Sequence, residues 1–94
     1  MTSEVIEELS RIIEDRKRNP RDGSYTCKLF EAGSAEILKK VGEEAVEVVV
    51  AGALESDDRL VYETADLVYH MLVMLAAREL DWQDVEAELE RRFR

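Results

Sequence analysis

Apolar residues recur along the first part of the chain at the three- and four-residue spacing of a helix face. A stripe of isoleucine and leucine between positions 6 and 13 predicts a first helix from about Glu4 to Arg18. Its last three residues are basic, which suits a helix C-terminus because the helix dipole favours cations there. The following segment, 19–23, contains the only proline and a glycine, and we expect it to end the helix.

Two long helices are predicted in the middle of the chain. Ser34 is a favourable N-cap, and the helical pattern behind it runs from Ala35 to about Leu54. The turn 56–58 separates this helix from a third one, which we expect to run from Asp58 or Arg59 to about Glu79. Because the turn between them is short, the two helices should lie antiparallel.

The remaining segments are shorter. The stretch Ser24–Phe30 shows no long helical repeat, and we expect an ordered loop there, holding at most a short helical turn over Thr26–Phe30. Asp81 is expected to cap a short last helix, with Asp84 at its third position near the positive end of the dipole. No segment predicts a strand. The fold class is therefore all-α, an antiparallel bundle of about four helices.

The helix predicted to end near Glu79 is apolar around nearly its whole axis. A soluble helix that is apolar on every side has to be buried on every side. A chain of 94 residues buries only about 60–65% of the surface of its extended form. We therefore expect a second subunit to cover the remainder, in a symmetric homodimer that completes the bundle.

Composition then excludes several classes of function. The chain has 22 acidic residues against 13 lysines and arginines, a formal net charge of −9, which argues against nucleic-acid binding. The single cysteine, Cys27, excludes an intramolecular disulfide and a zinc site built from cysteines. No apolar run reaches the roughly 18 residues that span a bilayer, and the N-terminal residues show no signal-peptide pattern. We expect one cytoplasmic domain over residues 1–94, with neither membrane nor nucleic acid as a partner.

Two pairs of acidic residues stand at a spacing of three, one on each long helix. Glu44 and Glu47 form the first pair, and Glu63 and Asp66 form the second. Residues three apart are neighbours on a helix surface, and Glu44 and Asp66 share their faces with apolar side chains. The antiparallel arrangement lets the two pairs converge. Acid pairs of this kind are also common on solvated helices, so spacing alone leaves both interpretations open.

Converging buried carboxylates favour a divalent cation. Buried anions are costly unless they are paired or bound to a cation. Mg²⁺, or Mn²⁺, prefers oxygen ligands and usually shares its coordination shell with substrate phosphates. A di-iron centre of the ferritin type is the competing metal interpretation, but it needs Glu-x-x-His pairs that are not present here. The only histidine, His70, is expected to be a hydrogen-bonded core residue or to orient Asp66, and Glu43 is expected to be a surface or supporting residue.

Basic residues close to the acids would supply further charge for a phosphate chain. Lys39 and Lys40 lie one turn before the first acid pair, and Lys40 is closer to the face of Glu44. Lys28, in the segment 24–30, is a third candidate. Ordinary ion pairing on a helix surface would also account for the first two lysines.

These residues resemble a known family. The two acid pairs are similar to the metal motif of the all-α nucleoside-triphosphate pyrophosphohydrolases, the MazG-like superfamily. Within that superfamily, the chain resembles phosphoribosyl-ATP pyrophosphohydrolase of histidine biosynthesis over nearly its whole length, and three blocks in the same order carry the resemblance. The blocks are 24–29 (SYTCKL), 37–47 (ILKKVGEEAVE) and 63–70 (ETADLVYH).

The resemblance implies hydrolysis of the α–β phosphoanhydride of 1-(5-phosphoribosyl)-ATP, giving 1-(5-phosphoribosyl)-AMP and pyrophosphate, the second step of L-histidine biosynthesis. In the enzyme it implies, the four acids bind Mg²⁺, Glu44 or Glu47 accepts the proton of the attacking water, and the three lysines hold phosphate oxygens. The substrate would also contact Ser24, Tyr25 and Thr26. The family's next enzyme, a cyclohydrolase, is often fused to it, and a chain of 94 residues is expected to be the stand-alone version.

Two alternatives remain open at this point. One is a house-cleaning pyrophosphohydrolase acting on non-standard nucleoside triphosphates, which would use the same acids. The other is a non-catalytic dimeric helical interaction module, in which the acids would hold no metal. Release of pyrophosphate from a nucleotide separates the second alternative from both enzymes.

Overall fold

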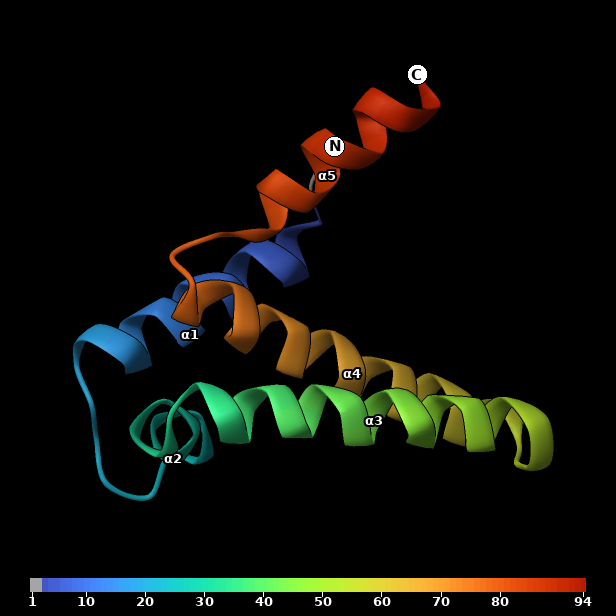
Figure 1. The fold of residues 1–94 in the computed structure, drawn as a ribbon, viewed down its shortest axis with the longest axis horizontal. Helices are drawn as coiled ribbons and strands as arrows, with labels where there is room; N and C mark the ends of the chain where they lie inside the picture. Colours follow the sequence, from blue (N-terminus) through green and yellow to red (C-terminus); the bar gives the residue numbers. More distant parts are fainter. Residues whose placement is uncertain (1–2) are drawn as a thin grey trace.

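The computed structural model describes residues 3–94, which form five helices and no strand (Figure 1). The prediction of an all-α fold is therefore confirmed. In chain order the helices are α1 (Glu4–Arg18), α2 (Tyr25–Ala32), α3 (Ser34–Leu54), α4 (Asp57–Ala77) and α5 (Trp82–Phe93).

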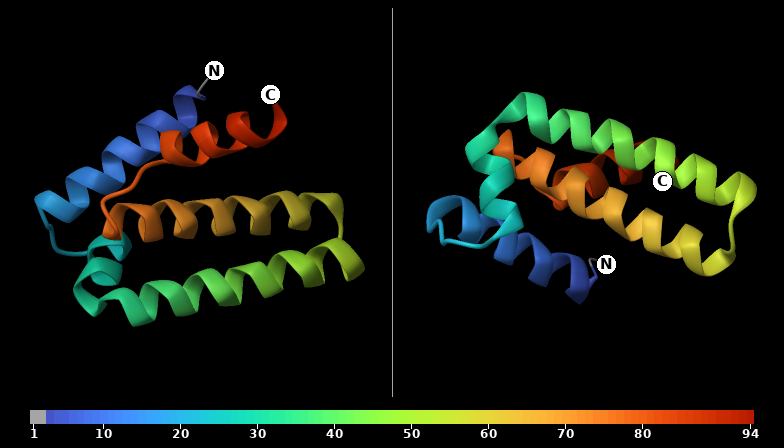
Figure 2. Two further views of the ribbon diagram at one scale, coloured as in Figure 1. Left: turned by 45° about the horizontal axis from the view of Figure 1, so that its top comes forward. Right: turned by 90° about the horizontal axis from the view of Figure 1, so that it is seen from below.

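The two longest helices, α3 and α4, have 21 residues each and form an antiparallel hairpin (Figure 2). The connection is short because α3 ends at Leu54 and Ser56 is already the N-cap of α4. The hydroxyl of Ser56 accepts a hydrogen bond from the main-chain N–H of Arg59 at 3.3 Å. The two helices pack along their length, and this hairpin carries all four of the acids singled out in the sequence. The hairpin is therefore the element that positions the candidate site.

The hydrophobic core lies at the end of the hairpin away from the α3–α4 turn. Five buried side chains make up its centre, contributed by α1, α2, α3 and α4: Ile13, Leu29, Ile37, Leu72 and Val73. Lys17 adds a polar tie between α1 and α4, since its Nζ donates to the carbonyl oxygen of Ala76 at 2.7 Å. Within the described chain, the helices α1 and α2 cover this end of the hairpin only.

The segment expected to be an ordered loop with a short helical turn over Thr26–Phe30 is the eight-residue helix α2, so the turn lies inside a real helix and the loop assignment was wrong. Ser24 starts the helix, because its hydroxyl accepts from the main-chain N–H of Cys27 at 3.1 Å. The buried side chain of Leu29 then anchors the helix in the core. A helix this short is marginal by itself, so its stability comes from tertiary packing, which the local sequence pattern does not reveal.

The predicted N-cap of the next helix was also wrong. Ser34 is the first residue of α3 and makes no capping hydrogen bond with its side chain, while Gly33 ends α2 and precedes α3. Gly33 has a φ of +98°, a left-handed conformation that glycine adopts without steric cost. The abrupt change of direction between α2 and α3 therefore depends on this glycine.

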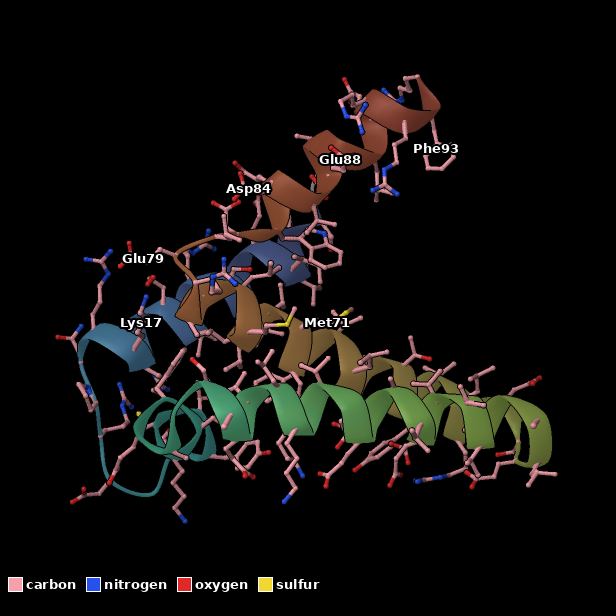
Figure 3. All side chains as sticks on the ribbon, viewed as in Figure 1. Lys17, Met71, Glu79, Asp84, Glu88 and Phe93 are labelled. Carbon is pink, nitrogen blue, oxygen red and sulfur yellow. The ribbon has the colours of Figure 1, made fainter. Side chains whose placement is uncertain are left out.

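The last helix begins as predicted. The side chain of Asp81 accepts hydrogen bonds from the main chain of Gln83 and Asp84, and the Asp84 carboxylate bonds back to the N–H of Asp81, which completes a capping box. Beyond Trp82, which packs against the core, α5 contributes no buried residue. It extends away from α3 and α4, with Phe93 near its outer end (Figure 3).

Part of the apolar surface of the hairpin stays exposed in a single chain. On α4, Val61 and Tyr62 are 69% and 57% exposed, so the expectation that α4 is buried on every side is not met within one protomer. By length and composition alone α4 would also be long and apolar enough to cross a membrane. Core helices of soluble proteins share these properties, and α4 carries the acids Glu63 and Asp66 and packs against α3. The predicted homodimer stays a prediction.

Candidate metal centre

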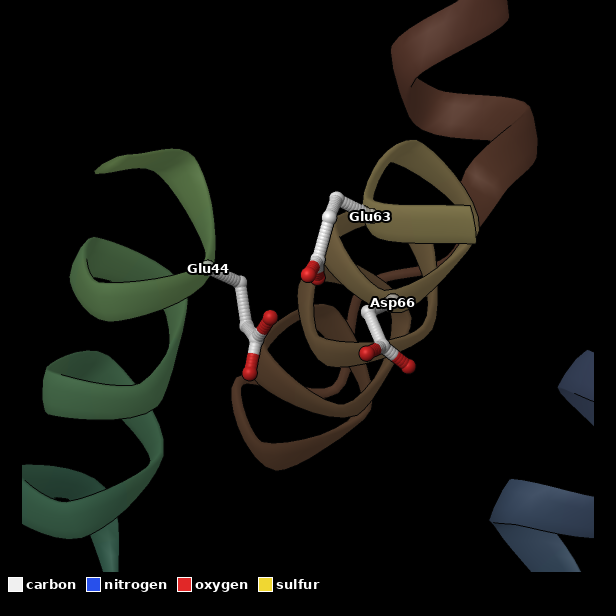
Figure 4. A group of neighbouring side chains, drawn as sticks. All are labelled: Glu44, Glu63 and Asp66. Atoms are coloured by element: carbon white, nitrogen blue, oxygen red, sulfur yellow. The ribbon is translucent and has the colours of Figure 1, made fainter. Parts of the chain in front are cut away.

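Three of the four predicted acids meet between α3 and α4. Glu44 comes from α3, and Glu63 and Asp66 come from α4, and one carboxylate oxygen of each lies within 4.8 Å of the other two (Figure 4). Glu63 is buried, whereas Glu44 and Asp66 are half-buried. We call these three residues the carboxylate trio. Glu44 and Glu63 point toward each other from the two helices, and Asp66 lies beside them on α4 (Figure 4). The hairpin thus brings together one member of the first pair and both members of the second.

Glu47 does not belong to the trio. It is exposed on α3, one turn beyond Glu44. Residues three apart on a helix point about 60° away from each other. Glu44 and Glu47 therefore have different orientations relative to α4. Glu47 still lies close enough to Glu63 to raise the pKa of its carboxyl group, through a hydrogen-bonding and a charge interaction.

Glu63 is the member of the trio with the most unusual environment. Burial is the main cause that raises the pKa of its carboxyl above the ordinary 4.5, and the carboxyls of Glu47 and Glu44 raise it further. The Arg59 guanidinium acts in the opposite direction. A buried carboxylate among other acids is stabilised by a divalent cation, and hard oxygen donors are the ligands that Mg²⁺ and Mn²⁺ prefer. The donor set therefore fits such an ion.

Arg59 is a further residue of the site, and it was not predicted from the sequence. Its Nη2 atom donates to Oε2 of Glu63 at 2.7 Å, its Nε lies 3.6 Å from Oε1 of Glu55, and its guanidinium carbon lies 4.7 Å from the ring centroid of Tyr62. The available signal was its position four residues before Glu63, a spacing at which helical side chains touch. Arg59 is the cation that contacts the trio within the described residues.

His70 holds the main chain of Asp66 rather than its carboxylate. Its Nδ1 lies 2.8 Å from the carbonyl oxygen of Asp66, and its Nε2 lies 2.9 Å from the hydroxyl of Tyr25. A carbonyl oxygen can only accept, so Nδ1 carries a proton, and in the neutral ring Nε2 then accepts from Tyr25. The ring is buried. His70 is thus a hydrogen-bonded core histidine, one of the two roles considered from the sequence, and it reaches Asp66 through the backbone.

The residues Ser24, Tyr25 and Thr26, predicted to touch substrate, all have partners inside the protein. Ser24 caps α2, and the hydroxyl of Thr26 is hydrogen-bonded to that of Tyr69 on α4. The Tyr25 ring stacks with that of Tyr69 at a centroid distance of 6.2 Å. These contacts fix the start of α2 against α4, so at least part of the role of this segment is structural.

Tyr25 also interacts electrostatically with charged residues of the site. Burial raises the pKa of its hydroxyl, Lys40 opposes this, and Glu44 and Asp66 add to the increase. The pKa of Lys40 is raised in turn, mainly by Tyr25 and also by Glu43 and Glu44. Tyr25 and Lys40 therefore lie at the α2 side of the trio.

The three predicted phosphate-binding lysines differ in their exposure and in their contacts. Lys40 is half-buried and forms an ion pair with Glu43, with 3.4 Å between Nζ and Oε1. Lys39 and Lys28 are exposed, on α3 and α2 respectively. The structure thus sets the charge of Lys40 beside the trio, and Glu43 contacts this lysine rather than the trio itself.

Comparison with known proteins adds a second line of argument. The family model described as phosphoribosyl-ATP pyrophosphohydrolase matches residues 6–93. A phosphoribosyl-ATP pyrophosphatase of Trichlorobacter lovleyi is 53% identical over 89 residues, which cover 95% of this chain and 82% of that protein. One of Metallosphaera sedula is 50% identical over 92 residues, 98% of this chain and 99% of that protein.

A longer relative carries a second activity in its name. A bifunctional histidine biosynthesis protein of Caldanaerobacter subterraneus subsp. tengcongensis is 50% identical over 91 residues, which cover 97% of this chain. The matched region is 44% of that protein, so this chain spans less than half of it.

Proposed function

The chain belongs to the phosphoribosyl-ATP pyrophosphohydrolase family, and from that membership we propose that it hydrolyses the α–β phosphoanhydride of 1-(5-phosphoribosyl)-ATP. The products are 1-(5-phosphoribosyl)-AMP and pyrophosphate, in a cytoplasmic step of L-histidine biosynthesis. The observation that carries the chemistry is the carboxylate trio, three acids from two helices with ligand atoms within 4.8 Å of one another.

In this proposal Glu44, Glu63 and Asp66 hold Mg²⁺, or Mn²⁺, and Glu47 lies at the edge of the site. A divalent cation bound there neutralises the charge of the phosphate chain and of the departing pyrophosphate and activates the attacking water. Support comes from the donor chemistry, because three carboxylates supply the hard oxygen ligands that these ions prefer. Burial is the main cause that raises the pKa of Glu63, so its charged form is disfavoured in the metal-free protein and a bound cation would favour it.

We assign the remaining charges by position. Glu47 is exposed and its carboxyl group reaches Glu63 at the edge of the trio, a position from which it could accept the proton of the attacking water. Lys40, which interacts with Tyr25 and Glu44, is the lysine that we assign to a phosphate oxygen, whereas Lys39 and Lys28 are exposed and are assigned no phosphate contact. Replacing Glu47 with Gln should abolish pyrophosphate release and leave the helical circular dichroism spectrum intact. Retained turnover would remove Glu47 from this role.

A homodimer is the second part of the proposal. The surface of α3 that faces away from the core carries an exposed apolar stripe, which a second copy would cover. Its members are Leu38, Val46, Val49, Val50 and Leu54. Val61 and Tyr62 extend exposed apolar surface onto α4. Burial of such a surface is the main driving force of association between subunits.

The test of function is a comparison of substrates. Pyrophosphate release is measured for phosphoribosyl-ATP and for ATP, dATP and ITP, each with Mg²⁺. We expect phosphoribosyl-ATP to be preferred in kcat/KM. Equal or better turnover of the simple triphosphates would favour a house-cleaning pyrophosphohydrolase, and no release from any of them would favour the non-catalytic helical module.

A further inference from the structure

We propose that Arg59 is the built-in counter-ion of the metal centre, pairing with Glu63 while the centre is metal-free and withdrawing onto Glu55 and Tyr62 when a divalent cation binds. This inference rests on the proposed function, since it takes the carboxylate trio as the metal site. It adds a positioning residue that controls how tightly the site binds its cation.

The contact between Arg59 and Glu63 joins a surface side chain to a buried one. The Nη2–Oε2 distance is 2.7 Å, the Glu63 side chain is 6% exposed and that of Arg59 is 50% exposed. A buried carboxylate needs a partner, because it has lost its hydration. The guanidinium supplies that partner from the solvent side of the site and can return to solvent, because half of its side chain is already hydrated.

A divalent cation at the trio competes with this arrangement. Glu63 belongs to the trio, so the cation and the guanidinium would share one carboxylate group. The cation and the guanidinium carry charge of the same sign, so they repel each other when both lie against this carboxylate. Binding of the cation is therefore coupled to withdrawal of Arg59.

The structure already contains the position to which Arg59 would withdraw. Nε of Arg59 lies 3.6 Å from Oε1 of Glu55, and the guanidinium lies 4.7 Å from the centroid of the Tyr62 ring. Glu55 is exposed and immediately precedes the cap of α4, outside the trio. A carboxylate and an aromatic face are both good partners for a guanidinium. Arg59 thus gives up Glu63 without losing its other two contacts.

The first experiment measures the affinity of the whole protein for Mn²⁺ alone, from the electron paramagnetic resonance signal of the free ion. For Arg59→Gln we expect binding about tenfold tighter than wild type, a coupling of the size usual between linked sites. The control is Arg92→Gln, which removes the same charge from an i,i+4 pair with Glu88 on α5, and its affinity should equal that of wild type. Arg59→Lys keeps the charge and should also remain close to wild type.

A second readout separates this role from a purely structural one. Arg59→Gln should lower the melting temperature of the metal-free protein more than that of the Mn²⁺-saturated protein, because the buried Glu63 charge is uncompensated only in the former. Equal losses in both forms would mean that Arg59 keeps the same partner in both states, and would overturn the proposal.

A third variant predicts a change of the opposite sign. Glu55→Gln removes the second partner of Arg59, so Arg59 should hold Glu63 more strongly and Mn²⁺ should bind more weakly. In the Arg59→Gln background the same substitution should have a smaller effect, and the difference between the two backgrounds measures the coupling.

The outcomes distinguish this inference from the metal site itself. If wild type binds Mn²⁺ and Asp66→Asn loses it, but Arg59→Gln binds as wild type or more weakly, the role of Arg59 is wrong and the metal centre stands. If wild type binds no Mn²⁺, or if Asp66→Asn binds as well as wild type, both proposals are wrong.

Discussion

The hydroxyl of Tyr25 lies 2.9 Å from Nε2 of His70, and this contact joins α2 to α4 across 45 positions of the sequence. The other ring nitrogen of His70 bonds to the main-chain carbonyl of Asp66. One histidine therefore connects the start of α2 with a member of the carboxylate trio. The contact between Thr26 and Tyr69 joins the next residue of α2 to the preceding residue of α4 and reinforces it.

Tyr25→Phe removes this link and keeps the ring. A hydrogen bond of this kind contributes about 0.5–1.5 kcal/mol, which for a chain of this size lowers the melting temperature by a few degrees. Tyr62→Phe is the matched control, because in residues 3–94 the Tyr62 hydroxyl makes no hydrogen bond to the protein. Thermal unfolding of both variants in EDTA measures the difference. Identical melting of Tyr25→Phe and wild type would show that the link contributes nothing to stability.

The raised pKa of Glu63 predicts a pH dependence for the metal-free protein. Burial and the neighbouring acids keep the folded-state pKa above the ordinary 4.5. The unfolded chain therefore loses this proton at lower pH than the folded chain does. The free energy of unfolding falls as the pH rises from 4.5 to the folded-state pKa of Glu63, and levels off above that pKa. Glu63→Gln keeps an oxygen acceptor for Arg59 and removes this dependence.

Urea unfolding in EDTA between pH 4.5 and 8 measures that effect. The stability of Glu63→Gln relative to wild type should increase with pH over this window. Curves that stay parallel across the range would contradict the assigned pKa direction.

Lys40 and Lys39 form a matched pair of neighbours with different predicted roles. Tyr25 and Glu44 act electrostatically on Lys40, which is half-buried, whereas Lys39 is exposed. Lys40→Ala should raise KM for phosphoribosyl-ATP by about tenfold or more, since a hydrogen bond to a charged group contributes about 1.5–3 kcal/mol. Lys39→Ala should leave KM near its wild-type value. Steady-state kinetics of both variants measure the ratio, and equal effects would mean that α3 presents no specific phosphate contact at Lys40.

The apolar stripe on α3 predicts a concentration-dependent dimer. Val49 is 69% exposed in a single chain. Val49→Asp would bury an unpaired charge in the interface, which is costly, so the variant should run as a monomer. Light scattering coupled to size-exclusion chromatography measures the mass, with Ala87→Asp on α5 as the control for added charge. A wild-type protein that is monomeric at all concentrations would contradict the proposed dimer.

The fold was largely predictable for helices whose own sequence contains an apolar stripe or a capping motif. The apolar stripe of α1 predicted its bounds, Glu4–Arg18, and the Asp81–Asp84 capping box marked the start of α5. The helix α2 was not predictable in this way, because eight residues contain too few turns for a periodic signal. Its contacts to α4 join residues 43 and 45 positions apart, and no local pattern encodes them.

The candidate site was predictable in its elements but not in its geometry. The i,i+3 pairs and the short α3–α4 turn sufficed to bring Glu44, Glu63 and Asp66 together. Whether Glu47 joined them depended on the rotation of α3 about its axis, which is set by core packing at Ile37 and Ala51. Arg59 was overlooked because a basic residue four positions from an acid is common on solvated helices, and only the burial of Glu63 makes this pair unusual.

The most direct test of the central claim is the release of pyrophosphate from phosphoribosyl-ATP by wild type and by Asp66→Asn, each with Mg²⁺, with excess EDTA, and after Mg²⁺ is restored. We predict release by wild type with Mg²⁺, none with EDTA, and recovery when Mg²⁺ is returned. Asp66→Asn should stay inactive in all three conditions with an unchanged helical spectrum. Turnover that continues in EDTA, or full activity of Asp66→Asn, would contradict a metal centre built on the carboxylate trio.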